Sequence, residues 1–265
     1  MRFESLGENC EFGLVQRRCG ADPLGLFRFG STPIEKLLEA LEARLEGLGA
    51  PGRISIELSA NGREYMVNDH QFGLPYHAWV LAGEMTPDQV LQREMRRLPL
   101  LIRKLIEDLS NGAKIFVCHG MDKGLPDADV QRLTEVARGY GPNTVLWVGL
   151  ADEAHPPGTV EWAGPDLLKG YIDRFAPGDD AHEFSLAGWV AICREAHRLW
   201  QQRKDQHRVA ATAAAVTDST PTTAVAAAES APVRKRAKRR DRAWPNAAAA
   251  DGSADRAAKV AGSRP

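Results

Sequence analysis

The sequence is poor in cysteine and has no long run of apolar residues. Its 265 residues include four cysteines, which lie far apart and form no CxxC pair. A disulfide-stapled secreted scaffold and a cysteine-rich zinc site are therefore excluded. The first residues show no apolar stretch of a signal peptide, and no apolar run reaches the roughly 18 residues of a membrane span. We therefore expect a cytoplasmic protein with no membrane association.

The sequence also lacks an excess of either charge, because its formal net charge is -1. Residues 204–265 nevertheless hold 12 of the 34 Lys and Arg and only 6 of the 35 Asp and Glu. This part is rich in Ala and poor in aromatics, so it cannot bury enough apolar surface to offset the entropy of ordering. We predict a folded domain over residues 1–203 and a disordered basic tail over residues 204–265. A basic cluster at 234–242 would contact nucleic acid only weakly, through charge, and no other nucleic-acid partner is expected.

Phosphate-binding glycine loops, internal repeats and metal-ligand spacings are absent as well. Asp69, His70, His77 and His119 are residue types that bind metals, but their spacing matches no known ligand pattern. We therefore expect neither a metal nor another cofactor. An arginine-rich segment at 93–104 could bind an anion, although such a run is more typical of a solvated helix face.

The pattern that is present indicates alternating strands and helices. Residues 114–118 and 144–148 are short apolar runs typical of buried strands, and residues 126–138 carry apolar side chains on one helical face. This order predicts a parallel β-α-β unit. The expected fold class is therefore α/β, a single layered domain with a central, partly parallel sheet flanked by helices. Residues 53–58 and 63–67 indicate a separate hairpin.

Capping residues mark the longer helices. Thr32 opens a capping-box pattern before a helix that we expect to end at Gly49. Thr86 opens a second one, and Pro99 inside the helix that follows predicts a kink or a break. A last helix is expected over residues 185–200.

Candidate chemistry is concentrated near the N-terminus, in the segment SLGENC at residues 5–10. We expect a helix over residues 10–18, with Asn9 as its N-cap and Cys10 in its first turn. Unpaired backbone N–H groups and the positive end of the helix dipole favour a thiolate there, as a nucleophile requires. The alternative is that Cys10 is a small buried side chain beside a strand-to-helix turn.

A second segment, DHQFGLPYH at residues 69–77, is dense in groups that can move protons. The two segments, followed by a basic helix and the strand at 114–118, resemble a bacterial family of papain-like cysteine peptidases whose function is unknown. The resemblance covers roughly residues 3–120 and implies that Cys10 is the nucleophile and His77 the base. It also makes a papain-like α+β arrangement the alternative fold.

The partner that would orient the imidazole of His77 is less clearly marked. The family pattern places an acidic residue directly after the histidine, but Ala78 stands there in this sequence. Asp69 is the first candidate partner, and Asp152 and Asp173 are later ones. His70 is the other histidine of the segment and the competing candidate base.

Two functions follow from these residues. The first is a cysteine-dependent hydrolase or acyl transferase, in which a Cys10–His77 pair acts on a small molecule or a peptide and the N–H groups of the first helical turn bind an oxyanion. The second is a non-catalytic α/β module that binds a sugar, a nucleotide or a glycan precursor, since no substrate-reading motif is evident.

Overall fold

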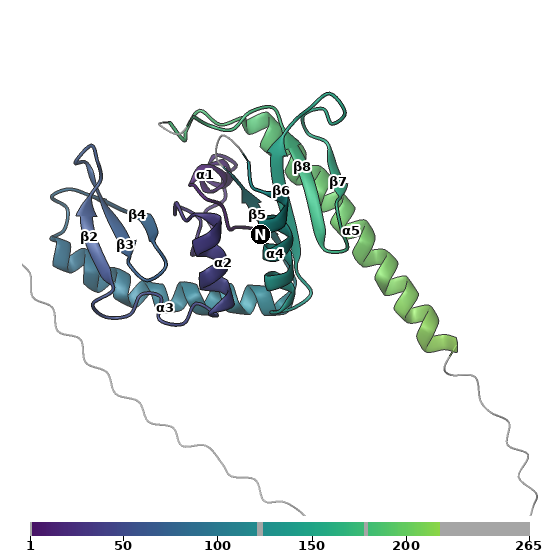
Figure 1. Cartoon of the computed structure of the whole chain (residues 1–265), viewed down its shortest axis with the longest axis horizontal. Coiled ribbons are helices and arrows are strands. Elements are labelled where there is room, and N and C mark those ends of the chain that lie inside the picture. Colours follow the sequence, from purple (N-terminus) through teal and green to yellow (C-terminus); the bar gives the residue numbers. More distant parts are fainter. Residues whose placement is uncertain (1, 121–123, 178–179, 218–265) are drawn as a thin grey trace, which may run out of the picture. The chain divides into compact units, whose positions relative to one another are not determined.

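A mixed sheet of five strands organises the larger part of the chain (Figure 1). The computed structural model describes residues 2–120, 124–177 and 180–217. In spatial order the sheet contains β1 (Phe3–Ser5), β5 (Ile115–His119), β6 (Thr144–Leu150), β8 (Leu167–Ile172) and β7 (Val160–Trp162). The first four strands are parallel neighbours, and β7 pairs with β8 in the antiparallel sense. The predicted α/β class and the partly parallel sheet are confirmed.

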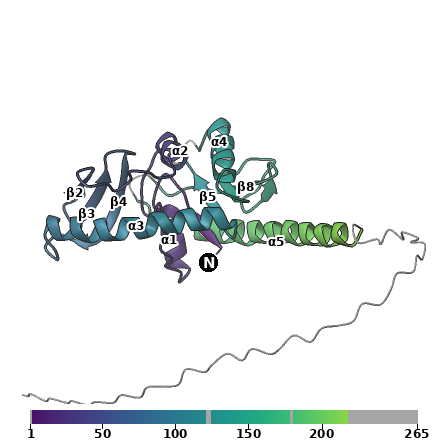
Figure 2. The same cartoon turned by 90° about the horizontal axis from the view of Figure 1, so that it is seen from below.

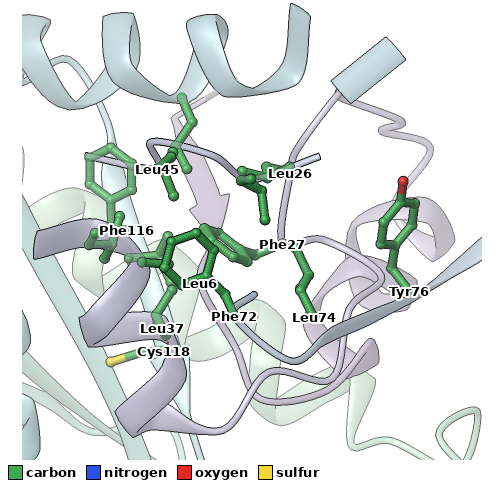
Figure 3. Close-up of a cluster of buried hydrophobic side chains, with 14 of the residues drawn as sticks. Leu6, Leu26, Phe27, Leu37, Leu45, Phe72, Leu74, Tyr76, Phe116 and Cys118 are labelled. Atoms are coloured by element: carbon green, nitrogen blue, oxygen red, sulfur yellow. The ribbon is translucent and has the colours of Figure 1, made fainter. Parts of the chain in front are cut away.

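Helices cover both faces of this sheet because successive side chains of a strand point to opposite faces. Phe116 and Cys118 belong to one core cluster, and Ile115 and Val117 belong to another. The first cluster includes side chains of α2 (Ile34–Glu42), α3 (Pro87–Asn111) and α4 (Asp127–Arg138). The second includes side chains of α1 (Glu11–Arg18) and α5 (Leu186–Thr217). Figure 3 shows the first cluster, in which Leu6 lies among aromatic and aliphatic side chains of several elements.

A smaller antiparallel sheet packs against α3. It consists of β2 (Ile54–Leu58), β3 (Glu64–Asp69) and β4 (Leu74–Leu81). The first two strands form the predicted hairpin. The third strand, β4, was not predicted, and it contains the last four residues of the second motif, including His77.

Two helices differ from their predicted extents. The helix expected to reach Gly49 ends at Glu42, and Thr32 Oγ1 accepts no hydrogen bond from the first N–H groups of the helix. Instead Glu8 Oε1 accepts from the backbone N–H of Ile34 at 3.2 Å. The predicted break at Pro99 is wrong, because α3 runs unbroken through it (Figure 2). Pro99 is on the exposed side, where water can satisfy the carbonyl that the proline ring leaves without a donor.

The last helix is longer than predicted. It was expected over residues 185–200, but α5 continues to Thr217 and so includes residues 204–217, the first part of the predicted tail. The Ala-rich composition explains this, because alanine favours a helix without any burial. Residues 218–265, including the basic cluster at 234–242, lie outside the described residues. Among the helices of the described segments, none has the length and apolar character needed to cross a membrane.

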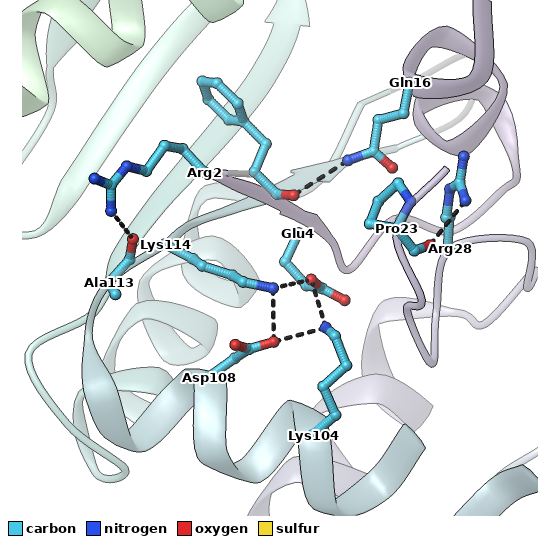
Figure 4. Close-up of polar contacts among 10 residues, drawn as sticks. Arg2, Glu4, Gln16, Pro23, Arg28, Lys104, Asp108, Ala113 and Lys114 are labelled. Atoms are coloured by element: carbon cyan, nitrogen blue, oxygen red, sulfur yellow. Dashed lines mark hydrogen bonds and ion pairs between the residues drawn. The ribbon is translucent and has the colours of Figure 1, made fainter. Parts of the chain in front are cut away.

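The short strand β1 that leads into the first motif is held by charged side chains (Figure 4). Glu4 is buried, and its Oε2 accepts from Lys114 Nζ at 2.6 Å and from Lys104 Nζ at 3.1 Å. Both ammonium groups also donate to Asp108 Oδ2, each at 2.7 Å. Burial acts to raise the pKa of Asp108, but the two lysines outweigh burial and lower it. The cluster fixes β1 to α3 and therefore fixes where the following loop begins.

Candidate functional site

Cys10 lies where the loop after β1 turns into α1. The helix begins at Glu11, so Cys10 is its N-cap residue and not a member of the first turn. Asn9 therefore precedes the N-cap, but its Oδ1 still accepts from the backbone N–H of Glu11 at 2.9 Å. Gly7, the glycine of the motif, lets the backbone pass close to the His119 ring, since a Cβ added to Gly7 would lie 3.2 Å from His119 Nε2. The predicted placement of Cys10 at a helix start is thus confirmed to within one residue.

Cys10 and His77 line the same cavity, which has a volume of about 170 Å³. Its wall is formed by Asn9, Cys10, Phe29, Gly30, Ser31, Met66, Pro75, His77, Ala176, Pro177 and Ala181. Loop residues 29–31 are tied to β4, because Ser31 N donates to Pro75 O at 2.9 Å and His77 N donates to Phe29 O at 3.3 Å. The cavity therefore joins four parts of the chain: the first motif, the loop at 29–31, the small sheet and the segment after β8.

Glu64 is the acidic partner of His77. His77 Nδ1 lies 2.9 Å from Glu64 Oε1, and the two side chains are 31% and 21% exposed. The pairing follows from the strand register. Met66 is opposite His77, so Glu64, two residues along β3, is a diagonal neighbour on the same face. With Nδ1 directed to the carboxylate, Nε2 is the ring nitrogen left for a group in the cavity.

Asp69 does not contact His77. It is buried, and its Oδ1 accepts from the N–H groups of Gln71 and Phe72, each at 3.0 Å. Its Oδ2 accepts from Gly49 N at 2.9 Å. Asp69 alternates with Glu64 and Met66 along β3, so it points to the other face of the small sheet. Its carboxylate shapes the turn between β3 and β4 and does not orient the imidazole.

The remaining sequence-predicted residues lie outside the cavity wall, except Asn9. His70 is exposed and follows β3. Asp152 is exposed and pairs with His155, its Oδ1 lying 2.8 Å from His155 Nδ1. Asp173 is exposed directly after β8. The structure therefore brings together Cys10, His77 and Asn9 and leaves the others apart.

The electrostatic surroundings of Cys10 differ from the prediction. Burial raises the pKa of the Cys10 thiol, and the negative charges of Glu11 and Glu64 raise it further. The backbone N–H of Cys10 acts in the opposite direction but does not outweigh them. The pKa is thus shifted in the direction opposite to the expected one, which favours the protonated thiol near neutral pH. Burial also raises the pKa of Cys118 and of Cys193 to about 12.

Glu11 was missed by the sequence analysis, although it directly follows Cys10. It is fully buried, and its Oε1 accepts from Trp189 Nε1 at 2.7 Å. Its Oε2 accepts from Ala176 N at 3.0 Å. These bonds join α1 to α5 and to the segment that lines the cavity. No local pattern marks such a carboxylate, because its partners lie more than 160 residues away.

His119 is buried beside Glu11 at the end of β5. Its ring stacks on Phe175, with centroids 5.2 Å apart, and Nδ1 lies 3.1 Å from Gly120 O. Burial lowers the pKa of His119, so the ring is neutral. Within the ranges that the structure describes, no three His, Cys, Asp or Glu side chains are placed to hold a metal ion.

Comparisons with known proteins identify no relative of this chain. No protein-family model, no curated protein and no solved structure matches it significantly. The resemblance to papain-like cysteine peptidases therefore stays a prediction that depends on the two motifs.

Proposed function

We propose that the chain is a cysteine-dependent hydrolase or acyl transferase that uses Cys10, His77 and Glu64. The observation that carries this proposal is the shared cavity, which a cysteine and a histidine both line while a carboxylate pairs with Nδ1 of that histidine. A nucleophile, a base and a group that orients the base are the parts that acyl transfer requires.

The raised thiol pKa indicates how the first step runs. Because Cys10 is protonated at rest, Nε2 of His77 must take its proton as the sulfur attacks the acyl carbon. A C–S bond forms, and the carbonyl electrons move to oxygen. When the tetrahedral intermediate collapses, the bond to the leaving group breaks and the imidazolium of His77 returns the proton to that group. Water, or an acceptor in a transferase, then attacks the thioester carbon while His77 again takes the proton of the attacking group. When this second tetrahedral intermediate collapses, the C–S bond breaks, the acyl group leaves on water or on the acceptor, and the imidazolium of His77 returns the proton to the Cys10 sulfur.

Groups at the start of α1 are suited to the developing negative charge on oxygen. The backbone N–H of Cys10 lies beside its own sulfur, where it acts to lower the thiol pKa. The amide of Asn9 lines the cavity and is oriented by the bond between its Oδ1 and Glu11 N. Both are donors in fixed positions, and such donors stabilise an oxyanion at little reorganisation cost.

The same thiol pKa favours a second function, a non-catalytic binding module. A half-buried thiol whose pKa is raised by two carboxylates is a poor nucleophile unless His77 activates it. The cavity would then receive a small ligand, such as part of a sugar or a nucleotide, without forming a covalent bond.

Acetylation by p-nitrophenyl acetate separates these functions. The enzyme proposal predicts that Cys10 acquires an acetyl group at pH 7 faster than Cys19, the exposed cysteine of the same chain. His77→Ala should slow Cys10 by roughly 10²- to 10⁴-fold, the usual contribution of a general base. His70→Ala is the matched control and should change nothing, because His70 is exposed and lies outside the cavity wall. Site-resolved mass spectrometry gives all the rates.

Glu64→Gln tests the role of the carboxylate. Removing its charge should lower the pKa of Cys10 and increase the thiolate fraction at a given pH. Acetylation should nevertheless slow, because His77 loses the group that orients it. If Cys10 reacts no faster than Cys19, or if His77→Ala and His70→Ala behave alike, the enzyme proposal is wrong and the binding module is supported.

A further inference from the structure

A second cavity, of about 350 Å³, lies beside the Cys10–His77 cavity. Four arginines from α1, the loop after it and α3 line it, together with aromatic side chains. Its wall consists of Arg17, Asp22, Pro23, Leu24, Gly25, Arg28, Phe29, Ala78, Trp79, Arg93 and Arg97. We call it the arginine cavity.

The arginine cavity carries an excess of positive charge. Four guanidinium groups and one carboxylate, Asp22, give its described wall a net charge of about +3. Glu94 lies behind the wall, fully buried, and pairs with Arg93 at 2.7 Å and with Arg97 at 3.4 Å. Even with Glu94 included, about two positive charges remain. Guanidinium groups that gather around a cavity create a positive potential that attracts anions, and their planar donors match phosphate and carboxylate oxygens.

The guanidinium groups are held in place before any ligand arrives. Arg17 lies over the rings of Trp79 and Phe29, 4.3 and 4.6 Å from their centroids. Arg28 is buried and donates to carbonyl groups, including Pro23 O at 2.8 Å (Figure 4). A Cβ added to Gly13 would lie 2.2 Å from the Arg28 carbonyl oxygen, so only glycine permits this approach. Preorganised donors lose little entropy when they bind an anion.

The arginine cavity is continuous in its lining with the Cys10–His77 cavity. Phe29 belongs to both walls. A small gap between them is lined by Phe29, by His77 of one cavity and by Arg97 of the other. Groups of one ligand could therefore occupy both cavities.

Trp79, in the wall of the arginine cavity, has a strained backbone conformation. Its φ is 55°, a left-handed value that is unfavourable for a bulky residue, and 42% of it remains exposed. The strained residue lies in a β-bulge. Between the residue pairs Met66–His77 and Glu64–Leu81, β4 contains three residues and β3 only one. The bulge places the indole 5.6 Å from the His77 ring and 5.0 Å from the Phe29 ring, centroid to centroid. Bulges and strained residues commonly position side chains at functional sites.

We propose that the arginine cavity binds a phosphate group of the substrate. The remaining charge of about +2 matches a phosphate monoester, which carries about −1.5 to −2 at pH 7. The substrate class is thus an acyl compound with a phosphate-bearing part, whose acyl group reaches Cys10 while its phosphate lies among Arg17, Arg93 and Arg97. This inference rests on the proposed function for the acyl group, but anion binding itself does not.

Calorimetric titration of the Cys10→Ser variant with inorganic phosphate and with pyrophosphate tests the site at constant ionic strength. Saturable binding is expected. Arg17→Gln and Arg97→Gln should each weaken it by about 10- to 150-fold, the loss of one charge-assisted hydrogen bond of about 1.5–3 kcal/mol. Arg18→Gln and Arg96→Gln remove the same charge from the same helices outside the cavity wall and should leave the affinity within about twofold.

Three results would overturn the inference. The first is no saturable binding of either probe. The second is equal weakening by the cavity variants and by their controls, which would indicate general surface charge. The third is equally tight binding of acetate, which would make the cavity a carboxylate site. Acetylation of Cys10 by the neutral ester is measured separately. If Cys10 is acetylated through His77 but the chain binds no phosphate, the proposed function stands and this inference is wrong. If the chain binds phosphate but Cys10 is not acetylated through His77, the anion site stands and the proposed function is wrong.

Discussion

Removing the Glu11 carboxylate should weaken the whole domain, because this buried group joins α1, α5 and the segment after β8. Two hydrogen bonds are lost in Glu11→Ala, one from Trp189 Nε1 and one from Ala176 N. Hydrogen bonds to a charged group contribute about 1.5–3 kcal/mol each, so the free energy of unfolding should fall by about 3–6 kcal/mol. Glu11→Gln keeps one acceptor and should cost less.

Urea unfolding, followed by tryptophan fluorescence and by far-UV circular dichroism, measures this loss, and agreement of the two probes supports two-state analysis. Glu35→Gln is the matched control, since Glu35 is also in the first turn of a helix but is exposed. It should change stability by less than about 0.5 kcal/mol. A double-mutant cycle of Glu11→Ala with Trp189→Phe should give a coupling energy of about 1.5–3 kcal/mol.

A second observable depends on the same residue. Glu11 raises the pKa of Cys10, so both Glu11 variants should lower it, whatever they do to stability. The pKa of Cys10 is measured from the pH dependence of thiolate absorbance near 240 nm, in variants that keep Cys10 as the sole cysteine. If Glu11→Ala costs less than about 1 kcal/mol, or if the coupling energy is near zero, the bonds to Trp189 and Ala176 do not carry the stability assigned to them.

Two further predictions concern the core and the charged cluster. Leu41 of α2 is fully buried, so Leu41→Ala should lower the free energy of unfolding by about 2–5 kcal/mol in a denaturant melt. Leu100 is 55% exposed, so Leu100→Ala should lower it by less than about 0.5 kcal/mol. Similar values for both variants would place α2 outside the core. The folded-state pKa of Asp108 is lowered, so its contribution to stability is present above the unfolded value of about 3.9 and is lost as the pH falls through the folded value. Asp108→Asn should therefore be less stable than wild type at pH 7 and lose less stability on acidification, and equal acid sensitivity of the two proteins would contradict this.

The sequence predicted those parts of the fold that depend on local patterns. The runs at 114–118 and 144–148 became adjacent parallel strands because their apolar side chains must be buried on both faces. Leu45 and Leu48 are the reason why α2 was predicted to extend to Gly49 instead of ending at Glu42. Both are buried at helical spacing, yet a turn with left-handed Arg44 and Leu45 carries them into the core.

The candidate site was predictable only in part. Cys10 and His77 were marked by the two motifs, and the structure places both at one cavity. Glu64 was not marked, although residues 63–67 were expected to be a strand. Its contact with His77 depends on how β4 is aligned with β3. This alignment could not be predicted from alternating apolar residues, because Pro75 and the bulge at Trp79 interrupt the alternation in β4. Arg93 and Arg97 line an arginine cavity only together with Arg17 and Arg28, and the tertiary structure brings these four residues together.

The helix α3 acts as a spacer of fixed length between the two halves of the site. Near its start, Glu94 accepts from the hydroxyl of Tyr76, the neighbour of His77, at 3.1 Å. Near its end, Lys104 binds Glu4, which precedes the Cys10 loop. One residue added between Glu94 and Lys104 would turn one attachment about 100° relative to the other and shift it by about 1.5 Å. Substitutions on the exposed side of α3 leave this distance unchanged, so that side should vary freely in composition, whereas the segment should hardly vary in length.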